Sequence, residues 1–304
     1  MKTQKRAMTY GRGVFMAVAA AVAYGTNPLF ALPLYGDGFD ADTMLLLRYL
    51  PAALFLGGWM IWRRESFRMS VRDLIGAAVC GQLFSLSSLF LFQSYQKMDA
   101  GVASTLLFVY PMMVALIMAL GFREKSGKRV WAGIALSLVG VALLCRRADG
   151  AAVSGAGMVL VMLSALSYAV YMVAVNRTGL CRVPAVKLTF YVVLFGSLLY
   201  LFRLRFGMDL KGDFNLVAWI NIVGIALFPS VISMTCTTLA IQRIGATVTA
   251  ILGALEPVTA VAIGVALFGE RLSVRIVLGI VLILAAVILA ALDRRDGGTG
   301  AEKP

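Results

Sequence analysis

Two segments of the chain, QKMDAGVASTLLFVYPMM (96–113) and QRIGATVTAILGALEPVT (242–259), resemble each other closely enough to indicate an internal repeat. They align without a gap, and the proline near the end of the first, Pro111, coincides with Pro257 in the second. Both prolines lie inside long apolar runs, where a proline removes a backbone donor and disturbs the preceding turn. The segments therefore predict two halves of related structure, each with an interrupted helix at the same place.

The composition predicts that these halves lie in a membrane. Of the 304 residues, 61% are hydrophobic and 14% are charged, and the mean hydropathy is +0.88. Soluble domains average roughly 45–50% apolar and about 25% charged residues. Apolar runs of 18 or more residues, each long enough for a spanning helix, follow one another along the chain. We therefore predict an all-α integral membrane protein.

Ten transmembrane helices are predicted, in two five-helix repeats. Residues 1–147 form the first repeat, residues 148–292 the second, and residues 293–304 a disordered cytoplasmic tail. The predicted spans are 12–34, 42–62, 72–95, 100–121, 128–146, 155–176, 186–204, 217–241, 246–268 and 274–292. Because five is odd, the second repeat enters the membrane from the opposite side, so the repeats are inverted. Inverted repeats are typical of secondary transporters, whose halves move about a central site.

Basic residues set the expected orientation. With the N-terminus in the cytoplasm, 19 of the 28 Lys and Arg residues fall in cytoplasmic segments. The positive-inside rule then places both termini in the cytoplasm. The same rule explains the net charge of +13, so we expect no nucleic-acid partner.

Several kinds of chemistry are excluded or disfavoured by the residues. The chain has no histidine, which excludes a Ser-His-Asp or Cys-His nucleophile and the commonest zinc sites. The four cysteines are far apart and are interpreted as packing residues. No phosphate-binding or dinucleotide-binding glycine motif occurs. We expect no enzyme activity, catalytic residue, cofactor or metal site.

The sequence also resembles a known family. The recurrent P-x(12)-E, from Pro111 to Glu124 and from Pro257 to Glu270, is similar to the pattern of the drug/metabolite transporter superfamily, specifically EamA-domain transporters. So are LLLRYLPAALF in the second span and GERLSVRIVLGIVLILAAV near the end. The resemblance covers about residues 12–292. It implies a ten-helix carrier of the inner membrane, often an exporter of amino acids or other small metabolites and sometimes an importer.

The matched helix breaks at Pro111 and Pro257 predict a substrate site near the middle of the membrane. Each proline is expected to free a carbonyl one turn earlier, around Leu107 and Gly253; a kink that serves packing alone is the alternative. Other polar side chains at similar depth could line the same site, although such groups often bond to neighbouring helices instead. The candidate substrate-binding residues are Glu256, Tyr110, Asn27, Gln82, Ser85, Tyr168, Tyr171 and Ser230.

Two charged residues, Glu256 and Arg48, lie more than three residues from either end of a predicted span. Glu256 has no basic residue predicted at its depth, and an ionised carboxylate there would cost at least about 2–3 kcal/mol. It suits a proton-coupling site or a contact for a substrate ammonium; the alternative is that it braces the broken helix. The first repeat has Tyr110 at the equivalent position. Arg48 is interpreted as an interfacial anchor or as the partner of a carbonyl or an acid, ahead of a role in binding a substrate carboxylate.

The predicted function is secondary active transport of a small metabolite, an amino acid or related compound, by alternating access. Export is expected from the family resemblance, and a proton is the candidate coupling ion. The alternatives are an importer of a vitamin or metabolite with the same fold, and a facilitative channel. The expected partners are the substrate and the lipid bilayer, and a homodimer is left open.

Overall fold

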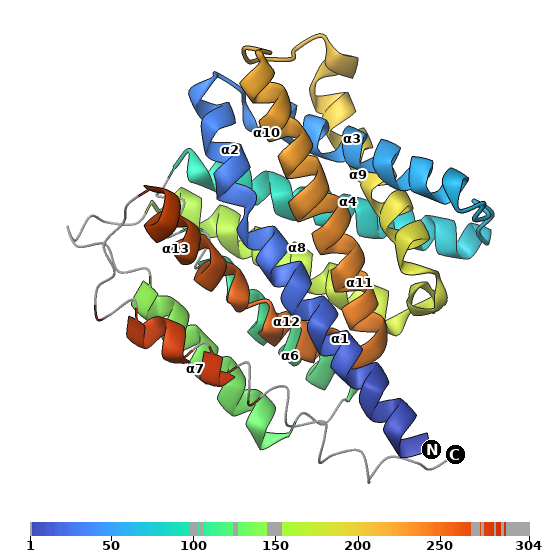
Figure 1. Cartoon of the computed structure of the whole chain (residues 1–304), viewed down its shortest axis with the longest axis vertical. Coiled ribbons are helices and arrows are strands. Elements are labelled where there is room, and N and C mark those ends of the chain that lie inside the picture. Colours follow the sequence, from blue (N-terminus) through green and yellow to red (C-terminus); the bar gives the residue numbers. More distant parts are fainter. Residues whose placement is uncertain are drawn as a thin grey trace.

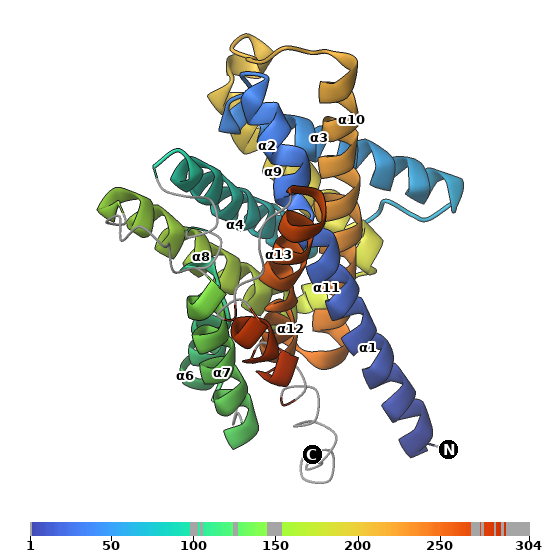
Figure 2. The same ribbon diagram turned by 60° about the vertical axis from the view of Figure 1, so that its left-hand side comes forward.

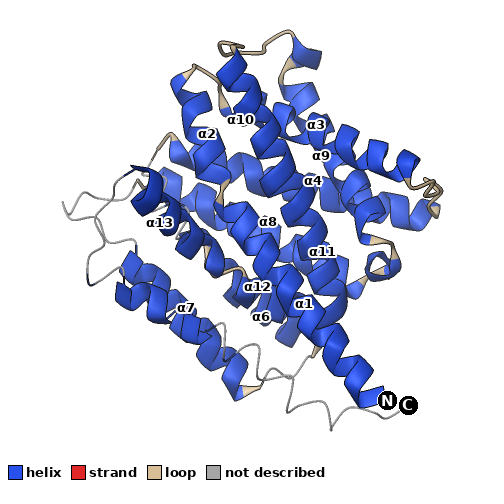
Figure 3. Cartoon of the chain, viewed as in Figure 1, coloured by secondary structure: helices blue, strands red, loops and turns tan. Residues whose placement is uncertain are grey.

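A computed structural model describes residues 2–97, 103, 106–123, 127–144, 154–268, 274, 277–282, 284–286 and 289. Its regular elements are all helices, and none of the described residues lies in a strand (Figure 3). This confirms the predicted all-α class. The tail, residues 293–304, lies outside the described residues.

The first half of the chain forms α1 (Lys2–Gly25), α2 (Asn27–Gly36), α3 (Ala41–Trp62), α4 (Val71–Tyr95), α6 (Tyr110–Phe122) and α7 (Lys128–Leu144). The second half forms α8 (Gly155–Arg177), η1 (Gly179–Arg182), α9 (Ala185–Arg203), η2 (Arg205–Gly207), α10 (Leu216–Ala226), η3 (Leu227–Ile232), α11 (Ser233–Ile244), α12 (Ala246–Leu252) and α13 (Leu255–Phe268).

Within the described residues, six helical segments are long and apolar enough to cross a membrane. They are Tyr10–Gly36, Ala41–Trp62, Val71–Tyr95, Gly155–Arg177, Ala185–Arg203 and Leu216–Ile244. Four shorter apolar helices, Tyr110–Phe122, Trp131–Gly140, Ala246–Thr259 and Val277–Ala286, coincide with the other four predicted spans. The chain is therefore a multi-pass membrane protein, and the exact count of ten spans stays a prediction.

Side chains just before the helices fix where several of them begin. The Asp40 carboxylate accepts a hydrogen bond from the Thr43 backbone N–H at 2.9 Å, before α3. The Asn215 side chain accepts from the Ala218 N–H at 2.8 Å, before α10. Such caps satisfy backbone donors that the first helical turn leaves without a partner.

The helices of the two halves contact each other in a reciprocal way (Figures 1 and 2). The first helix of the first half, α1, packs against α11 of the second, while α4 packs against α8, the first helix of the second half. Likewise α3 packs on α9, and α6 packs on α12. The contact between α6 and α8 corresponds to the contact between α13 and α1 in the other half. Two halves related by a two-fold axis give this pattern.

One close helix pair depends on a glycine. A Cβ at Gly81 of α4 would lie 2.6 Å from the Val192 backbone carbonyl of α9 and 3.0 Å from the Gly196 nitrogen. Only a residue without a side chain lets the two backbones approach this closely, as small residues do in membrane helix pairs. The contact between α4 and α9 thus depends on Gly81.

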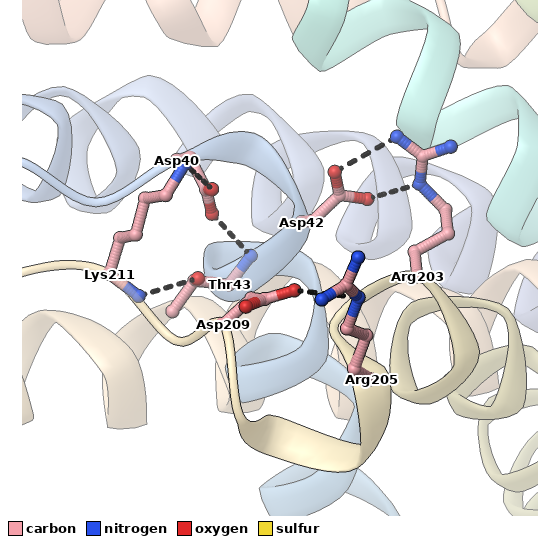
Figure 4. Close-up of polar contacts among 7 residues, drawn as sticks. All are labelled: Asp40, Asp42, Thr43, Arg203, Arg205, Asp209 and Lys211. Carbon is pink, nitrogen blue, oxygen red and sulfur yellow. Dashed lines mark hydrogen bonds and ion pairs between the residues drawn. The ribbon is translucent and has the colours of Figure 1, made fainter.

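Polar contacts connect two loops at one end of the molecule (Figure 4). The Arg203 guanidinium at the end of α9 donates to both carboxylate oxygens of Asp42, with distances of 2.6 and 3.0 Å. Lys211 forms an ion pair with Asp40 at 3.4 Å. Asp40 and Asp42 lie between the first two predicted spans or at the start of the second, and Arg203 and Lys211 lie at the end of the seventh span or after it. The predicted orientation puts both regions on the same, non-cytoplasmic side.

Several predicted spans are interrupted helices in the structure. Thr26 separates α1 from α2, and residues 253–254 separate α12 from α13, so the spans 12–34 and 246–268 are each two helices. In the span 217–241, six residues around Pro229 form a π-helix, η3. A proline lies within or just after each interruption, because its missing N–H breaks the regular bonding.

Candidate substrate-binding site

The break between α12 and α13 is a tightened turn. The Ala254 N–H donates to the Ile251 carbonyl at 3.0 Å, and the Glu256 N–H donates to the Gly253 carbonyl at 2.9 Å. Both bonds span three residues, as in a 3₁₀-helix. The expectation that Pro257 leaves the Gly253 carbonyl free is therefore wrong, because the tighter turn supplies a donor from Glu256.

Tyr110, at the position equivalent to Glu256, reaches across to the break in the other half. Its hydroxyl donates to the Ala250 backbone carbonyl of α12 at 3.2 Å, and its side chain is buried. Gly253 leaves room for this hydroxyl, since a Cβ there would overlap the Tyr110 Oη. Pro111 follows as the second residue of α6, where a missing N–H costs no helical bond. Tyr110 thus links the start of α6 in the first half to the interrupted helix of the second half.

Glu256 lies in the first turn of α13. A helix N-terminus favours negative charge, which lowers the cost of a carboxylate at this depth. Within the described part of the chain, the carboxylate has no hydrogen bond or ion pair, and its side chain is only partly buried. It lies close enough to Tyr24, Tyr110 and Tyr168 for its charge to act on their hydroxyl groups. The carboxylate is therefore able to bind a proton or a cationic group.

An aromatic cluster surrounds this acid. The rings of Tyr110 and Tyr168 meet edge to face with centroids 4.8 Å apart, and Tyr171 stacks on Tyr168 at 6.0 Å. Tyr168 is partly exposed, yet it faces away from the outward stripe of α8, formed by Val159, Leu163, Leu166 and Val170. The accessible surface of Tyr168 therefore faces the interior of the bundle.

Arg48, in α3, is a buried cation whose guanidinium adjoins Tyr24. Its side chain is 0% exposed. Its Nε donates to the Ser230 hydroxyl at 2.8 Å, and Nη2 donates to the Pro229 carbonyl at 3.2 Å. Within the part of the chain that the structure describes, Nη1 is buried without a hydrogen-bond partner, and no acid forms an ion pair with the guanidinium. The interfacial-anchor interpretation is therefore wrong, and the alternative of a carbonyl partner is confirmed.

Tyr24 of α1 adjoins both charged groups. The Arg48 guanidinium carbon lies 5.4 Å from the centre of the Tyr24 ring, a cation–π distance. The charge of Glu256 also acts on Tyr24. Like Tyr168, Tyr24 is partly exposed and points away from the outward residues of its helix, Phe15 and Val22. The structure thus brings a cation and an anion to one tyrosine in the interior.

The other predicted residues have separate roles. Gln82 donates to the Phe195 carbonyl at 2.7 Å and so joins α4 to α9. Ser230 accepts from Arg48 and donates to the Ile225 carbonyl at 3.2 Å. Among the described residues, the buried Ser85 hydroxyl and the Asn27 side-chain oxygen have no hydrogen-bond partner. The central cluster therefore consists of Glu256 and Tyr110 with Tyr168 and Tyr171, while Gln82 has a structural contact elsewhere.

Sequence reasoning left Tyr24 and Arg48 out of the substrate-binding set. The available signal for Arg48 was its position, a charge inside an apolar span, which by default indicates a functional site. Among the described residues, no group of three or more Cys, Asp or Glu is placed to hold a metal ion. The arrangement suits recognition of a small polar molecule by hydrogen bonds, charge and aromatic surface.

Comparisons with known proteins agree with this fold. The chain is similar to the Bacillus subtilis strain 168 protein named Uncharacterized transporter YxxF, at 24% identity over 93% of this chain and 90% of the relative. It is 25% identical to Uncharacterized inner membrane transporter YedA of Escherichia coli K12, over 92% and 91% of the two chains. It is 26% identical to an Uncharacterized transporter of Archaeoglobus fulgidus, over 94% and 97%.

A solved crystal structure superposes on the chain with a TM-score of 0.80 at 19% identity, covering 93% of this chain and 98% of the other, and supports the fold alone. The sequence pattern of the EamA-like transporter family matches twice, at residues 11–146 and 155–292. These matches cover most of both halves, so the chain belongs to the EamA-like transporter family, and it is a membrane transporter.

Proposed function

We propose that the protein is a secondary active transporter that exports a small metabolite, an amino acid or a related compound, across the inner membrane by alternating access. Glu256 carries the proposal: an acid without a described polar partner, at a helix break where the halves meet. The reciprocal contacts between the halves support a rocking motion about this point. The excess of basic residues in alternate loops supports cytoplasmic termini.

The charges in the interior suit a substrate that carries both an ammonium and a carboxylate. Glu256 accepts the ammonium, or a proton when the substrate is absent. The free Nη1 of Arg48 donates to the carboxylate, since guanidinium groups form strong charge-assisted bonds with carboxylates. Tyr24 and Tyr168 provide the surface between the two charges.

Proton coupling follows if substrate and proton compete for Glu256. A proton entering from outside displaces the substrate ammonium, and the emptied carrier returns with the proton bound. Each cycle then exchanges one proton for one substrate molecule. Transport should depend on both the proton gradient and the Glu256 carboxylate.

The test uses the purified protein in proteoliposomes. A panel of labelled amino acids and related metabolites is screened for counterflow, in which unlabelled substrate on one side drives labelled substrate inward. Saturable counterflow indicates a carrier, and flux without counterflow indicates a channel. The dominant direction under an imposed proton gradient, in vesicles of known protein orientation, separates export from import.

Glu256→Gln then tests the site, with Glu65→Gln as the matched control. Glu65 lies in the loop after α3, outside the spanning helices. We expect Glu256→Gln to abolish proton-driven transport and Glu65→Gln to leave it unchanged. Unaltered rate and pH dependence in Glu256→Gln would remove the coupling role and leave the bracing alternative.

A further inference from the structure

A second polar site lies at the end of the molecule opposite the ion pairs of Figure 4. A cavity of about 790 Å³ opens between the start of α4, the end of α8, η1 and the start of α9. Its charged lining residues are Arg68, Arg72, Asp73, Arg177, Arg182 and Lys187. Five cations therefore face one acid, and the predicted orientation places the cavity at the cytoplasmic surface.

The acid does not neutralise these cations. The Asp73 Oδ2 accepts a hydrogen bond from the Ser70 hydroxyl at 2.6 Å, and the Asp73 N–H donates back to that hydroxyl at 3.1 Å, which caps α4. Within the described part of the chain, no acidic group forms an ion pair with Arg68, Arg72 or Arg182. The cavity thus keeps an excess of positive charge.

The backbone around the cavity adds to this positive potential. Both α4 and α9 begin at the cavity wall, at Val71 and Ala185, so the positive ends of two long helix dipoles adjoin it. Pro184, just before α9, provides no side-chain cap. The end of α8 opposes this effect, but Arg177 lies in its last turn. Anions are the ligands that such an arrangement favours.

The wall of the cavity is held in place by bonds from α9. The Tyr191 hydroxyl donates to the Phe67 carbonyl at 2.7 Å, and the Lys187 ammonium donates to the Arg68 carbonyl at 3.3 Å. These bonds fix the loop that carries Arg68 against α9. A preformed cavity costs less ordering when a ligand binds than separate mobile side chains would.

The cavity also lies next to the lipid-facing surface. Val71 and Ile75, on the outer face of α4, are 73% and 60% exposed, while Arg72 between them lines the cavity. An apolar surface beside a basic cavity at a helix end is the expected setting for the head group of an anionic lipid. A free phosphate compound from the cytoplasm would meet the same cations.

We propose that this cavity binds a phosphate-bearing anion, with Arg72 and Arg182 as its main ligands. Guanidinium groups form paired hydrogen bonds with phosphate oxygens. The cavity therefore offers a specific ligand geometry, which the general positive charge of cytoplasmic loops does not. The ligand is either the head group of an anionic phospholipid or a free phosphate compound, and the two share the chemistry that the cavity recognises.

The experiment measures binding to the full-length protein in a neutral detergent. Native mass spectrometry gives the binding constants of phosphatidylglycerol and of phosphatidylcholine, which has the same phosphate without net charge. Calorimetry measures inorganic phosphate. The tested variant is Arg72→Gln/Arg182→Gln, and the matched control is Arg63→Gln/Arg64→Gln, which removes the same charge from the adjacent loop outside the cavity.

We expect the variant to weaken binding of the anionic probe on the order of tenfold or more, while the control stays within about twofold of the unmodified protein. If the protein binds phosphatidylglycerol more tightly than phosphatidylcholine and does not bind inorganic phosphate, the ligand is a lipid head group. If it binds inorganic phosphate, the ligand is a free anion. Equal weakening in both double variants, or no anionic probe that binds, would overturn the proposal. Thermal unfolding checks that the variants fold; if the double variant does not, Arg72→Gln and Arg182→Gln are measured singly.

Discussion

Replacing Gly253 by alanine tests how the two helix breaks are joined. Gly253 has φ −57° and ψ −20°, a conformation that alanine adopts without strain. By backbone entropy alone, the change should stabilise the protein by about 0.4–1 kcal/mol. The new Cβ, however, would overlap the hydroxyl oxygen of Tyr110. Overpacking of this kind costs about 1–3 kcal/mol, so we expect Gly253→Ala to destabilise the protein.

Tyr110→Phe should reduce that cost. The phenylalanine lacks the overlapping oxygen, and the next ring atom, Cζ, lies 3.3 Å from the position of the new Cβ, a close approach that a small shift of the ring relieves. Tyr110→Phe itself loses the bond to the Ala250 carbonyl, at a cost of about 0.5–1.5 kcal/mol. In that background the closest neighbour of the new Cβ is the Ala250 backbone carbonyl oxygen, at 3.0 Å, so Gly253→Ala should cost clearly less than it does beside the tyrosine. The coupling energy between the two changes should reach at least about 1.5 kcal/mol.

The assay is the apparent midpoint of thermal unfolding of the purified proteins, in one detergent and at one scan rate. For a chain of this size, each kcal/mol shifts the midpoint by roughly 2 °C. Gly58→Ala is the control, because a Cβ at Gly58 meets nothing within 4 Å. Equal destabilisation by Gly253→Ala in the tyrosine and phenylalanine backgrounds would refute the reasoning.

Three further changes test other contacts by the same unfolding midpoint. Gly81→Val should lower stability by about 3 kcal/mol or more, because its side chain would displace the α9 backbone at Val192; retention of the midpoint would show that the close approach is not required. Arg48→Lys should cost about 1–3 kcal/mol, since the charge stays buried but loses its fixed donors; an unchanged midpoint would mean that those bonds contribute nothing net. Asp42→Asn should cost less than about 1 kcal/mol, because its partner Arg203 is 42% exposed at the side chain; a larger loss would indicate a coupled network.

Much of the fold could be predicted from the sequence because apolar length and loop charge are local properties. The spans that became α3, α4, α8 and α9 agree with the structure to within one or two residues at each end. The interruptions were less predictable. Pro111 and Pro257 marked where the helices are disturbed, but a tightened turn re-bonds the Gly253 carbonyl, and sequence does not specify this geometry.

The site was harder to predict because its contacts join residues far apart in the chain. Glu256 stood out as an acid in an apolar run, and Tyr110 as its counterpart. Arg48 contacts a carbonyl and a hydroxyl 181 and 182 residues away, which no local pattern specifies. Tyr24 joins the site because both charges act on it in three dimensions.

The π-helix η3 has a consequence for how this segment tolerates insertions and deletions. The outward residues of α10 recur at spacings of three and four, at Leu216, Ile220 and Val223, but the next one, Phe228, comes five residues later. One wide turn thus accommodates an additional residue without rotating the lipid-facing stripe, which continues at Ile232. Deleting a single residue there would restore an ordinary helix and keep α11 in nearly the same rotation relative to α10, because Val223 and Phe228 would then be four residues apart. A one-codon deletion in 227–232 should therefore disturb the packing of this segment less than a one-codon deletion inside α10 or α11, which would turn the residues after it by about 100°.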